Sequence, residues 1–149
     1  MESTPEAIAH TDIMTSSTSS IIPQMTGFLS KSKYFYTHFF IDNISDYTFT
    51  YYTKSTDISE ALDAKRVYER EMHKYGKEIK HIHADNGTYA CKGYKDAVHN
   101  SKQSLTFCGA CAYFQNGKVE NRIKIVTLVA RTALINAIHK WPSVATLSL

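Results

Sequence analysis

Hydrophobic positions in this 149-residue chain fall into short runs and longer periodic segments, separated by polar turns. The short runs are rich in aromatic and β-branched residues, which is typical of β-strands. They predict strands over residues 7–14, 34–41, 48–53, 79–84 and 104–108. The second and third flank a short polar turn, so an antiparallel hairpin is predicted there. The Ser/Thr-rich residues 15–20 are expected to begin a polar loop that continues toward residue 33.

Two longer segments place apolar residues every three or four positions, which is the spacing of one face of an α-helix. The first covers residues 58–75 and is expected to end at Gly76, and the second covers residues 118–140 and stops before Pro142. A shorter and weaker helical pattern covers residues 93–101. The order of these elements predicts an α/β fold in which helices pack on a mixed sheet.

The composition fits one folded domain. Hydrophobic residues make up 43% and charged residues 21% of the chain, and 149 residues is a usual domain size, so we expect a single domain over residues 1–149. No apolar run approaches the ~18 residues that a membrane-spanning helix needs, and the N-terminus does not resemble a signal peptide. Because three cysteines cannot all pair, we expect free thiols and an intracellular protein.

The net charge of +3 is unevenly distributed along the chain. Residues 1–30 sum to −3, whereas the residues from 118 onward sum to +4. A basic C-terminal segment of this kind is what an anion-binding face would produce, and a solvated helix face would look the same. Charge alone therefore leaves both interpretations open.

Three acidic residues occupy distinctive positions. Asp12 lies in the first predicted strand, Asp85 directly follows the fourth, and Glu120 falls in the first turn of the last helix. Carboxylates at strand ends and a helix start can converge, and such hard oxygen ligands suit Mg²⁺ or Mn²⁺. Two such ions about 3.5–4 Å apart can support phosphodiester chemistry. Each acid also has a simpler explanation, as a turn residue, a partner of the helix dipole or a solvated side chain.

The segments around these acids form a recognisable series. Asp85 and Glu120 are 35 residues apart. The flanking motifs are His83-Ala84-Asp85-Asn86-Gly87-Thr88-Tyr89-Ala90, Thr106-Phe107-Cys108-Gly109, Gln115-Asn116-Gly117-Lys118-Val119-Glu120, Ala130-Arg131-Thr132-Ala133-Leu134 and Trp141-Pro142. In order and separation they resemble the catalytic core of copia-type retrotransposon integrases, a retroviral-like group with Asp, Asp and, 35 residues later, Glu. The upstream residues that also fit this type are Asp12, Ile22-Pro23-Gln24, Gly27, Phe40-Ile41-Asp42 and Ser45, so the resemblance covers about residues 8–142.

This resemblance implies an RNase H-like fold with a five-stranded mixed sheet, in which two parallel strands extend three antiparallel ones. It also implies DNA 3′-end processing and strand transfer, in which water or a DNA 3′-hydroxyl attacks a phosphodiester. Asp12, Asp85 and Glu120 would be the catalytic residues and the ligands of two Mg²⁺ or Mn²⁺ ions. The implied partner is double-stranded DNA, together with a possible second copy of the core, and the implied location in a eukaryotic host is the nucleus.

Contacts to DNA are expected around the start of the last helix. Lys118, Arg122 and Lys124 could meet phosphates, which would supply affinity with little sequence preference. Asn116 and Gly117 belong to a loop that helps to place the DNA end in the family. A solvated helix face would also explain the three cations.

Some features depart from the family. Asn121 stands where Arg commonly follows the catalytic Glu, and the 149 residues contain no zinc-binding N-terminal domain and no C-terminal DNA-binding domain. Two further functions therefore stay open beside the integrase: an inactive remnant or co-opted core that binds nucleic acid, and an RNase H-type nuclease. The Cys108-x-x-Cys111 pair, with His81 and His83 upstream, is the wrong arrangement for a structural zinc site, so no zinc is expected.

Overall fold

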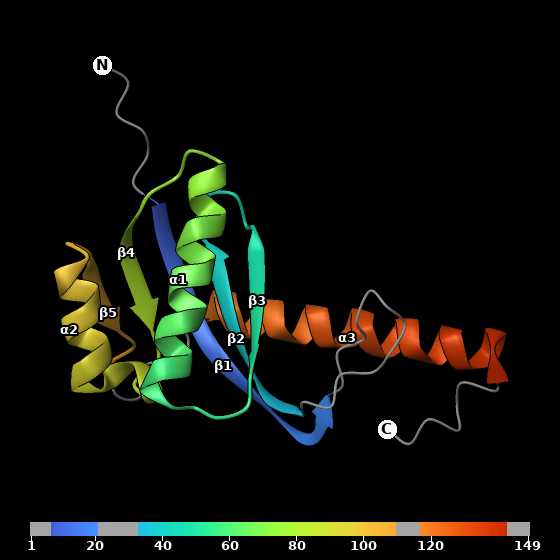
Figure 1. Ribbon diagram of the computed structural model, residues 1–149. Helices are drawn as coiled ribbons and strands as arrows, with labels where there is room; N and C mark the ends of the chain where they lie inside the picture. Colours follow the sequence, from blue (N-terminus) through green and yellow to red (C-terminus); the bar gives the residue numbers. More distant parts are fainter. Residues whose placement is uncertain (1–6, 21–32, 110–116, 143–149) are drawn as a thin grey trace.

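The computed structural model describes residues 7–20, 33–109 and 117–142 (Figure 1). Its strands are β1 (Ala7–Ser20), β2 (Tyr34–Asp42), β3 (Thr48–Thr53), β4 (Ile79–Ala84) and β5 (Ser104–Phe107). Its helices are α1 (Ile58–Lys74), the single 3₁₀ turn η1 (Thr88–Ala90), α2 (Lys92–Asn100) and α3 (Gly117–Lys140). The predicted strands and helices are all present, and their bounds agree within a few residues except at the end of β1.

The five strands form one mixed sheet in the order β3-β2-β1-β4-β5. β1 and β2 are antiparallel, as are β2 and β3, whereas β4 runs parallel to both β1 and β5. Two parallel strands thus extend three antiparallel ones. The predicted α/β class with a five-stranded RNase H-like sheet is confirmed.

β1 is longer than its sequence pattern predicts. The Ser/Thr-rich residues 15–20, expected as a loop, continue the strand to Ser20. They do so because β2 offers them a partner: Thr15 lies opposite Tyr36, and Ser20 lies opposite Tyr34 after an irregularity in register. The prediction of a loop was wrong here, since cross-strand pairing outweighs the turn preference of small polar residues.

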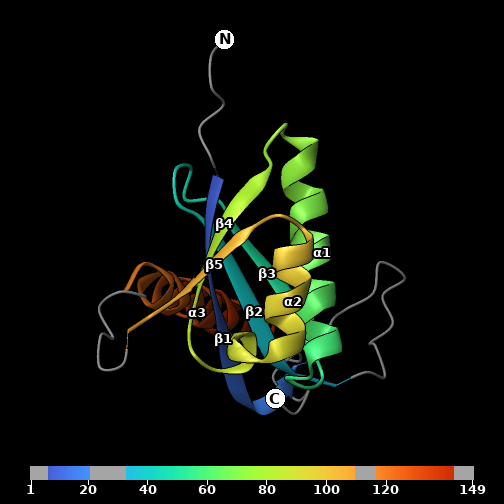
Figure 2. The ribbon, with the colours of Figure 1, turned by 90° about the vertical axis from the view of Figure 1, so that its left-hand side faces the viewer.

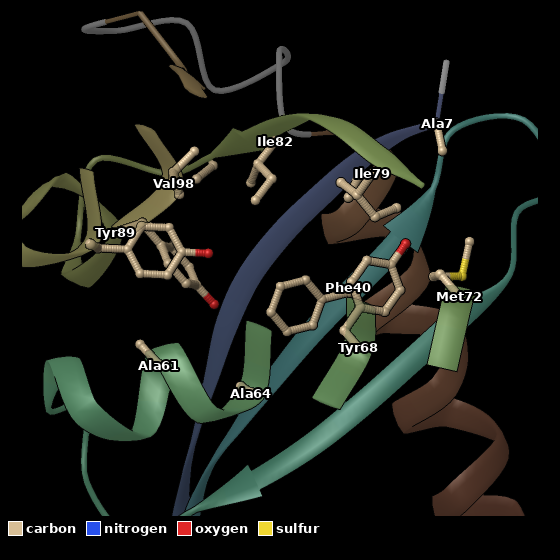
Figure 3. Close-up of a cluster of buried hydrophobic side chains, with 13 residues drawn as sticks. Ala7, Phe40, Ala61, Ala64, Tyr68, Met72, Ile79, Ile82, Tyr89 and Val98 are labelled. Carbon is tan, nitrogen blue, oxygen red and sulfur yellow. The ribbon is translucent and has the colours of Figure 1, made fainter. Parts of the chain in front are cut away.

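The larger core lies between the sheet and the helices α1 and α2, which cover the same face (Figures 1 and 2). Figure 3 shows its centre, where Phe40 of β2 stacks on Tyr68 of α1 with ring centroids 4.8 Å apart. Tyr89 of η1 meets Tyr94 of α2 edge-on beside them. Large aromatic side chains thus fill the layer between helices and sheet, and their burial is the main source of its stability.

The opposite face of the sheet carries the start of α3 (Figure 2). Val119 is fully buried there against Phe39 and Ile41 of β2, and Ile123 and Val126 pack beside it. Because side chains alternate between the two faces of a strand, Phe39 and Ile41 face α3 while Phe40 faces α1. The small second core fixes the first turns of α3 on the sheet.

The second half of α3 extends away from the sheet (Figure 1). The pattern of residues 118–140 predicts an amphipathic helix with one apolar stripe, and only its first three turns follow that expectation. Farther along, Ala130 and Ala133 of that stripe are exposed, and Leu128 and Val129 beside it are 66% and 62% exposed. No helix in the described part of the chain is long and apolar enough to cross a membrane.

Candidate active site

Asp12 and Asp85 are neighbours because of the parallel pairing of β1 and β4. Thr11 lies opposite Ala84 in this ladder, and the two aspartates are the next residues along each chain. Neighbouring strands run about 4.8 Å apart, so the two backbones are close at this point. Asp12 shares its side of β1 with Met14, which packs toward α3. The carboxylate of Asp12 therefore belongs to the α3 side of the sheet.

Glu120 reaches the same region through its neighbour in sequence. Val119 packs on Phe39, and Phe39 is the residue of β2 that lies opposite Asp12. The buried valine thus holds the first turn of α3 above the pair of strands that includes Asp12. A carboxylate in the first turn of a helix is also favoured by the helix dipole.

Electrostatic coupling shows that the three acids share one environment. Burial raises the pKa of Asp12 above its usual value, and the charges of Asp85 and Glu120 raise it further, while a hydrogen bond from the Ile13 amide opposes the rise. Burial likewise raises the pKa of the Cys108 thiol, and the same three carboxylates add to that shift. Three elements distant in the sequence therefore bring negative charge to one place.

Within the described ranges, no lysine, arginine or histidine forms an ion pair with Asp12, Asp85 or Glu120. Two of the three are held locally: Asp12 accepts a hydrogen bond from the Ile13 amide and Asp85 from the Asn86 amide, each at 2.7 Å. In these ranges no three His, Cys, Asp or Glu side chains lie close enough together to hold a metal ion. The structure thus brings the acids into one neighbourhood, but not into a finished ligand sphere.

The predicted DNA contacts have different surroundings. The Lys118 amine donates to the Asn43 carbonyl at 2.7 Å and pairs with Asp46 at 2.7 Å, so it is engaged in the turn between β2 and β3. Arg122 lies 3.9 Å from the same Asp46. Lys124 is exposed one turn beyond Glu120 and forms no ion pair within the described residues. Gly117 is the first residue of α3, and Asn116 lies outside the described residues.

The sequence interpretation missed the polar links that join the ends of β4 and β5 beside Asp85. The Asn86 side-chain amide donates to the Cys108 carbonyl at 2.7 Å, and His83 Nε2 lies 3.4 Å from the Cys108 sulfur. The Thr106 hydroxyl is 2.9 Å from His83 Nδ1. Strand alternation puts His83 on the same side of the sheet as Asp12. That alternation was the one signal in the sequence that could have indicated a link near the site. These links tie the turn containing Asp85 to its neighbouring strand.

His81 and His83, weighed above as zinc ligands, are instead bound to hydroxyl groups of β5. His81 Nδ1 lies 2.6 Å from the Ser104 hydroxyl and His81 Nε2 lies 2.8 Å from the Thr106 hydroxyl. Cys108 is buried and has a free thiol, while Cys111 lies outside the described residues.

Asp42 is the last residue of β2 and shapes the turn that follows. It is fully buried, accepts hydrogen bonds from the Ser45 amide and hydroxyl, and pairs with Lys77 at 2.7 Å. Although burial alone would raise the pKa of Asp42, the hydrogen bonds from Lys77 and Ser45 hold it below its usual value. Its charge is therefore compensated, unlike that of the three acids above.

Solved structures support the fold. No protein-family model matches the sequence, and no curated protein matches it. Among solved structures, the chain is similar to one in the simian T-cell lymphotropic virus intasome in complex with PP2A regulatory subunit B56 gamma, with 20% identity and a TM-score of 0.66. That similarity covers 97% of this chain and 44% of the viral one, so this chain spans less than half of that protein.

Two integrase catalytic cores are also similar. The magnesium complex of the HTLV-2 integrase catalytic core domain in its trimeric form has 18% identity and a TM-score of 0.58, over 89% of this chain and 74% of that one. The catalytic core domain of BIV integrase has 11% identity and a TM-score of 0.54, over 78% of this chain and 64% of that one. The mixed five-stranded sheet with its three helices is therefore the fold of retroviral integrase catalytic cores.

Proposed function

We propose that this chain is the catalytic core of a copia-type retrotransposon integrase. It would act as a metal-dependent polynucleotidyl transferase that processes DNA 3′ ends and joins them to target DNA. The observation that supports this most directly is that Asp12, Asp85 and Glu120, from three separate elements of an integrase-like fold, influence one another electrostatically. None of the three pairs with a protein cation within the described residues. Integration into chromosomal DNA would take place in the nucleus of a eukaryotic host.

The donor set suits divalent metal ions. Its three groups are carboxylates, which Mg²⁺ and Mn²⁺ prefer. The pKa of Asp12 is raised chiefly by burial and further by the charges of Asp85 and Glu120, and a bound cation would offset both effects. When bound, such ions supply activation of the attacking oxygen and stabilisation of the leaving oxygen. Asp12 and Asp85 would hold ions between the middle of β1 and the end of β4, and Glu120 would complete the set from α3.

The cations of α3 would bind the DNA backbone. Lys124 is exposed on the helix that presents Glu120, so a phosphate near the carboxylates would lie within reach of its amine. Lys118 and Arg122 would have to exchange Asp46 for phosphate. Such contacts give affinity that falls with salt and little sequence preference. HTLV-2 cores are described in dimeric and trimeric forms, which supports a homo-oligomer here as well.

The test is release of a strand from a branched DNA that mimics the strand-transfer product, incubated with the full chain and Mn²⁺. We expect release by the wild type and loss of at least about 100-fold in Asp85→Asn and in Glu120→Gln. Asp96→Asn is the matched control, because Asp96 is an exposed acid of α2, on the other face of the sheet. Equal activity in all four proteins would exclude the proposed site.

A nucleic-acid-binding core without catalysis is the second candidate. It is favoured by the absence, in the described residues, of any three side chains already close enough to hold a metal ion. DNA binding without strand release in Mg²⁺ or Mn²⁺ would support it. Hydrolysis of the RNA strand of an RNA–DNA hybrid, without action on the branched DNA, would point to an RNase H-type nuclease.

A further inference from the structure

Three buried polar side chains meet beneath the candidate site. The Thr11 hydroxyl donates a hydrogen bond to the Tyr89 hydroxyl at 3.0 Å, and the Tyr89 hydroxyl lies 2.8 Å from His38 Nδ1. All three residues are at most 1% exposed. Burying a polar group costs free energy unless a hydrogen bond replaces its lost hydration. These three side chains therefore depend on one another for their hydrogen bonds.

The three members come from the elements that surround the two aspartates. Thr11 directly precedes Asp12 on β1, with its side chain on the opposite face. Tyr89 belongs to η1, four residues after Asp85. His38 lies on β2, in the ladder that pairs this strand with the Asp12 segment of β1. One phenol hydroxyl therefore bridges β1, β2 and the turn that follows Asp85.

One assignment of the protons lets each hydroxyl donate a hydrogen bond. Because Thr11 donates to the Tyr89 oxygen, the Tyr89 proton is free to point at His38 Nδ1, which then accepts it. This requires a neutral imidazole with its proton on Nε2. Burial supports that state, since it lowers the pKa of His38 to about 4. Nε2 is buried without a hydrogen-bond partner among the described residues, and an unsatisfied buried N–H costs folding free energy.

Tyr94 provides a comparison, because it is a tyrosine of the same core whose hydroxyl makes no such hydrogen bonds within the described residues. Its ring meets that of Tyr89 edge-on at 5.0 Å between centroids, and it is equally buried. Its hydroxyl is buried without a hydrogen-bond partner within the described ranges. The two tyrosines share one packing environment and differ in what their hydroxyls bind.

We infer that Tyr89 is a positioning residue for the candidate site: its hydroxyl, bound to Thr11 and His38, fixes the turn containing Asp85 against the strand containing Asp12. One consequence of this role, tighter metal binding by the two aspartates, rests on the proposed function. Groups that orient metal ligands from behind affect metal affinity by about 10–100-fold. The backbone consequence, a rigid turn, is independent of any metal.

The test compares the full-length Tyr89→Phe and Tyr94→Phe variants with the wild type. In the metal-free proteins, amide hydrogen exchange at residues 85–88 should be at least about tenfold faster in Tyr89→Phe and unchanged in Tyr94→Phe. Titration with Mn²⁺, followed by the electron paramagnetic resonance of the free ion, should show about tenfold weaker binding in Tyr89→Phe alone. Circular dichroism checks that each variant is folded.

Thr11→Val provides a second route if Tyr89→Phe does not fold, because it removes one of the two bonds and retains the side-chain shape. It should change exchange and Mn²⁺ affinity in the same direction, by a smaller factor. Indistinguishable Tyr89→Phe and Tyr94→Phe proteins would overturn the inference. Faster exchange in Tyr89→Phe, combined with a wild type that binds no Mn²⁺, would leave the positioning role intact and refute the proposed function.

Discussion

Acid should destabilise this domain through one buried side chain, His38. The ring is inaccessible to solvent, and burial lowers its pKa from 6.5 to about 4. As the pH falls below 6.5, the unfolded chain takes up this proton while the folded protein does not. Protons therefore favour the unfolded state, and the contribution of His38 to stability, complete above about pH 6.5, is lost progressively between pH 6.5 and pH 4.

The size of the effect follows from the two pKa values. A pKa of 6.5 in the unfolded chain and about 4 in the folded protein correspond to about 3 kcal/mol lost when the pH is well below both. At pH 5 the loss is about 2 kcal/mol, and at pH 7 it is well below about 1 kcal/mol. A small domain is stable by about 5–15 kcal/mol, so this one histidine is a substantial part of the acid sensitivity.

The perturbation is His38→Gln, which retains a polar side chain and removes the titration. Urea unfolding at pH 7, 6 and 5, followed by circular dichroism, gives the free energy of unfolding of both proteins. Contributions of other groups cancel in the difference between them, including those of His10 and His83, whose pKa values are also lowered by burial. From pH 7 to pH 5 the wild type should lose about 2 kcal/mol more than the variant. An equal loss in both proteins would refute the reasoning.

Two further predictions concern the backbone at a turn and the electrostatics of α3. Gly76 follows the end of α1 with φ +69° and open space around it, so Gly76→Ala should cost about 1 kcal/mol in urea unfolding through the left-handed backbone alone. Gly117→Ala, at the first position of α3, where the space is equally open and the backbone is helical, should cost less than about 0.5 kcal/mol. Asp46→Asn should free Lys118 and Arg122 from a competing carboxylate and tighten binding to double-stranded DNA in fluorescence anisotropy; unchanged affinity would show that neither cation contacts DNA.

Much of the fold follows from local pattern. The aromatic and β-branched runs predicted the strands, and the periodic segments predicted α1 and α3, because in each case local preference and burial favour the same conformation. The Ser/Thr-rich end of β1 was missed since its conformation depends on pairing with β2, across a gap in sequence that local rules cannot evaluate.

Some features of the candidate site were predicted from the sequence and others were not. Asp12, Asp85 and Glu120 were singled out from their positions and spacing, and the structure places them in one electrostatic neighbourhood. The capture of Lys118 by Asp46 was not predictable, since it depends on where the turn between β2 and β3 lies relative to α3. The hydrogen bonds among Thr11, His38 and Tyr89 were also invisible, because each residue reads singly as an ordinary strand or turn residue.

The half of α3 that extends away from the sheet gives this protein two intrinsic spectroscopic signals, its helicity and the fluorescence of Trp141. An isolated helical segment of about a dozen residues is marginally stable in water, so the helicity of this half responds to whatever covers its apolar side chains. Trp141, the only tryptophan in the sequence, directly follows the helix and is 59% exposed. Its fluorescence emission should therefore shift to shorter wavelength when that region is covered, which reports assembly without any added label.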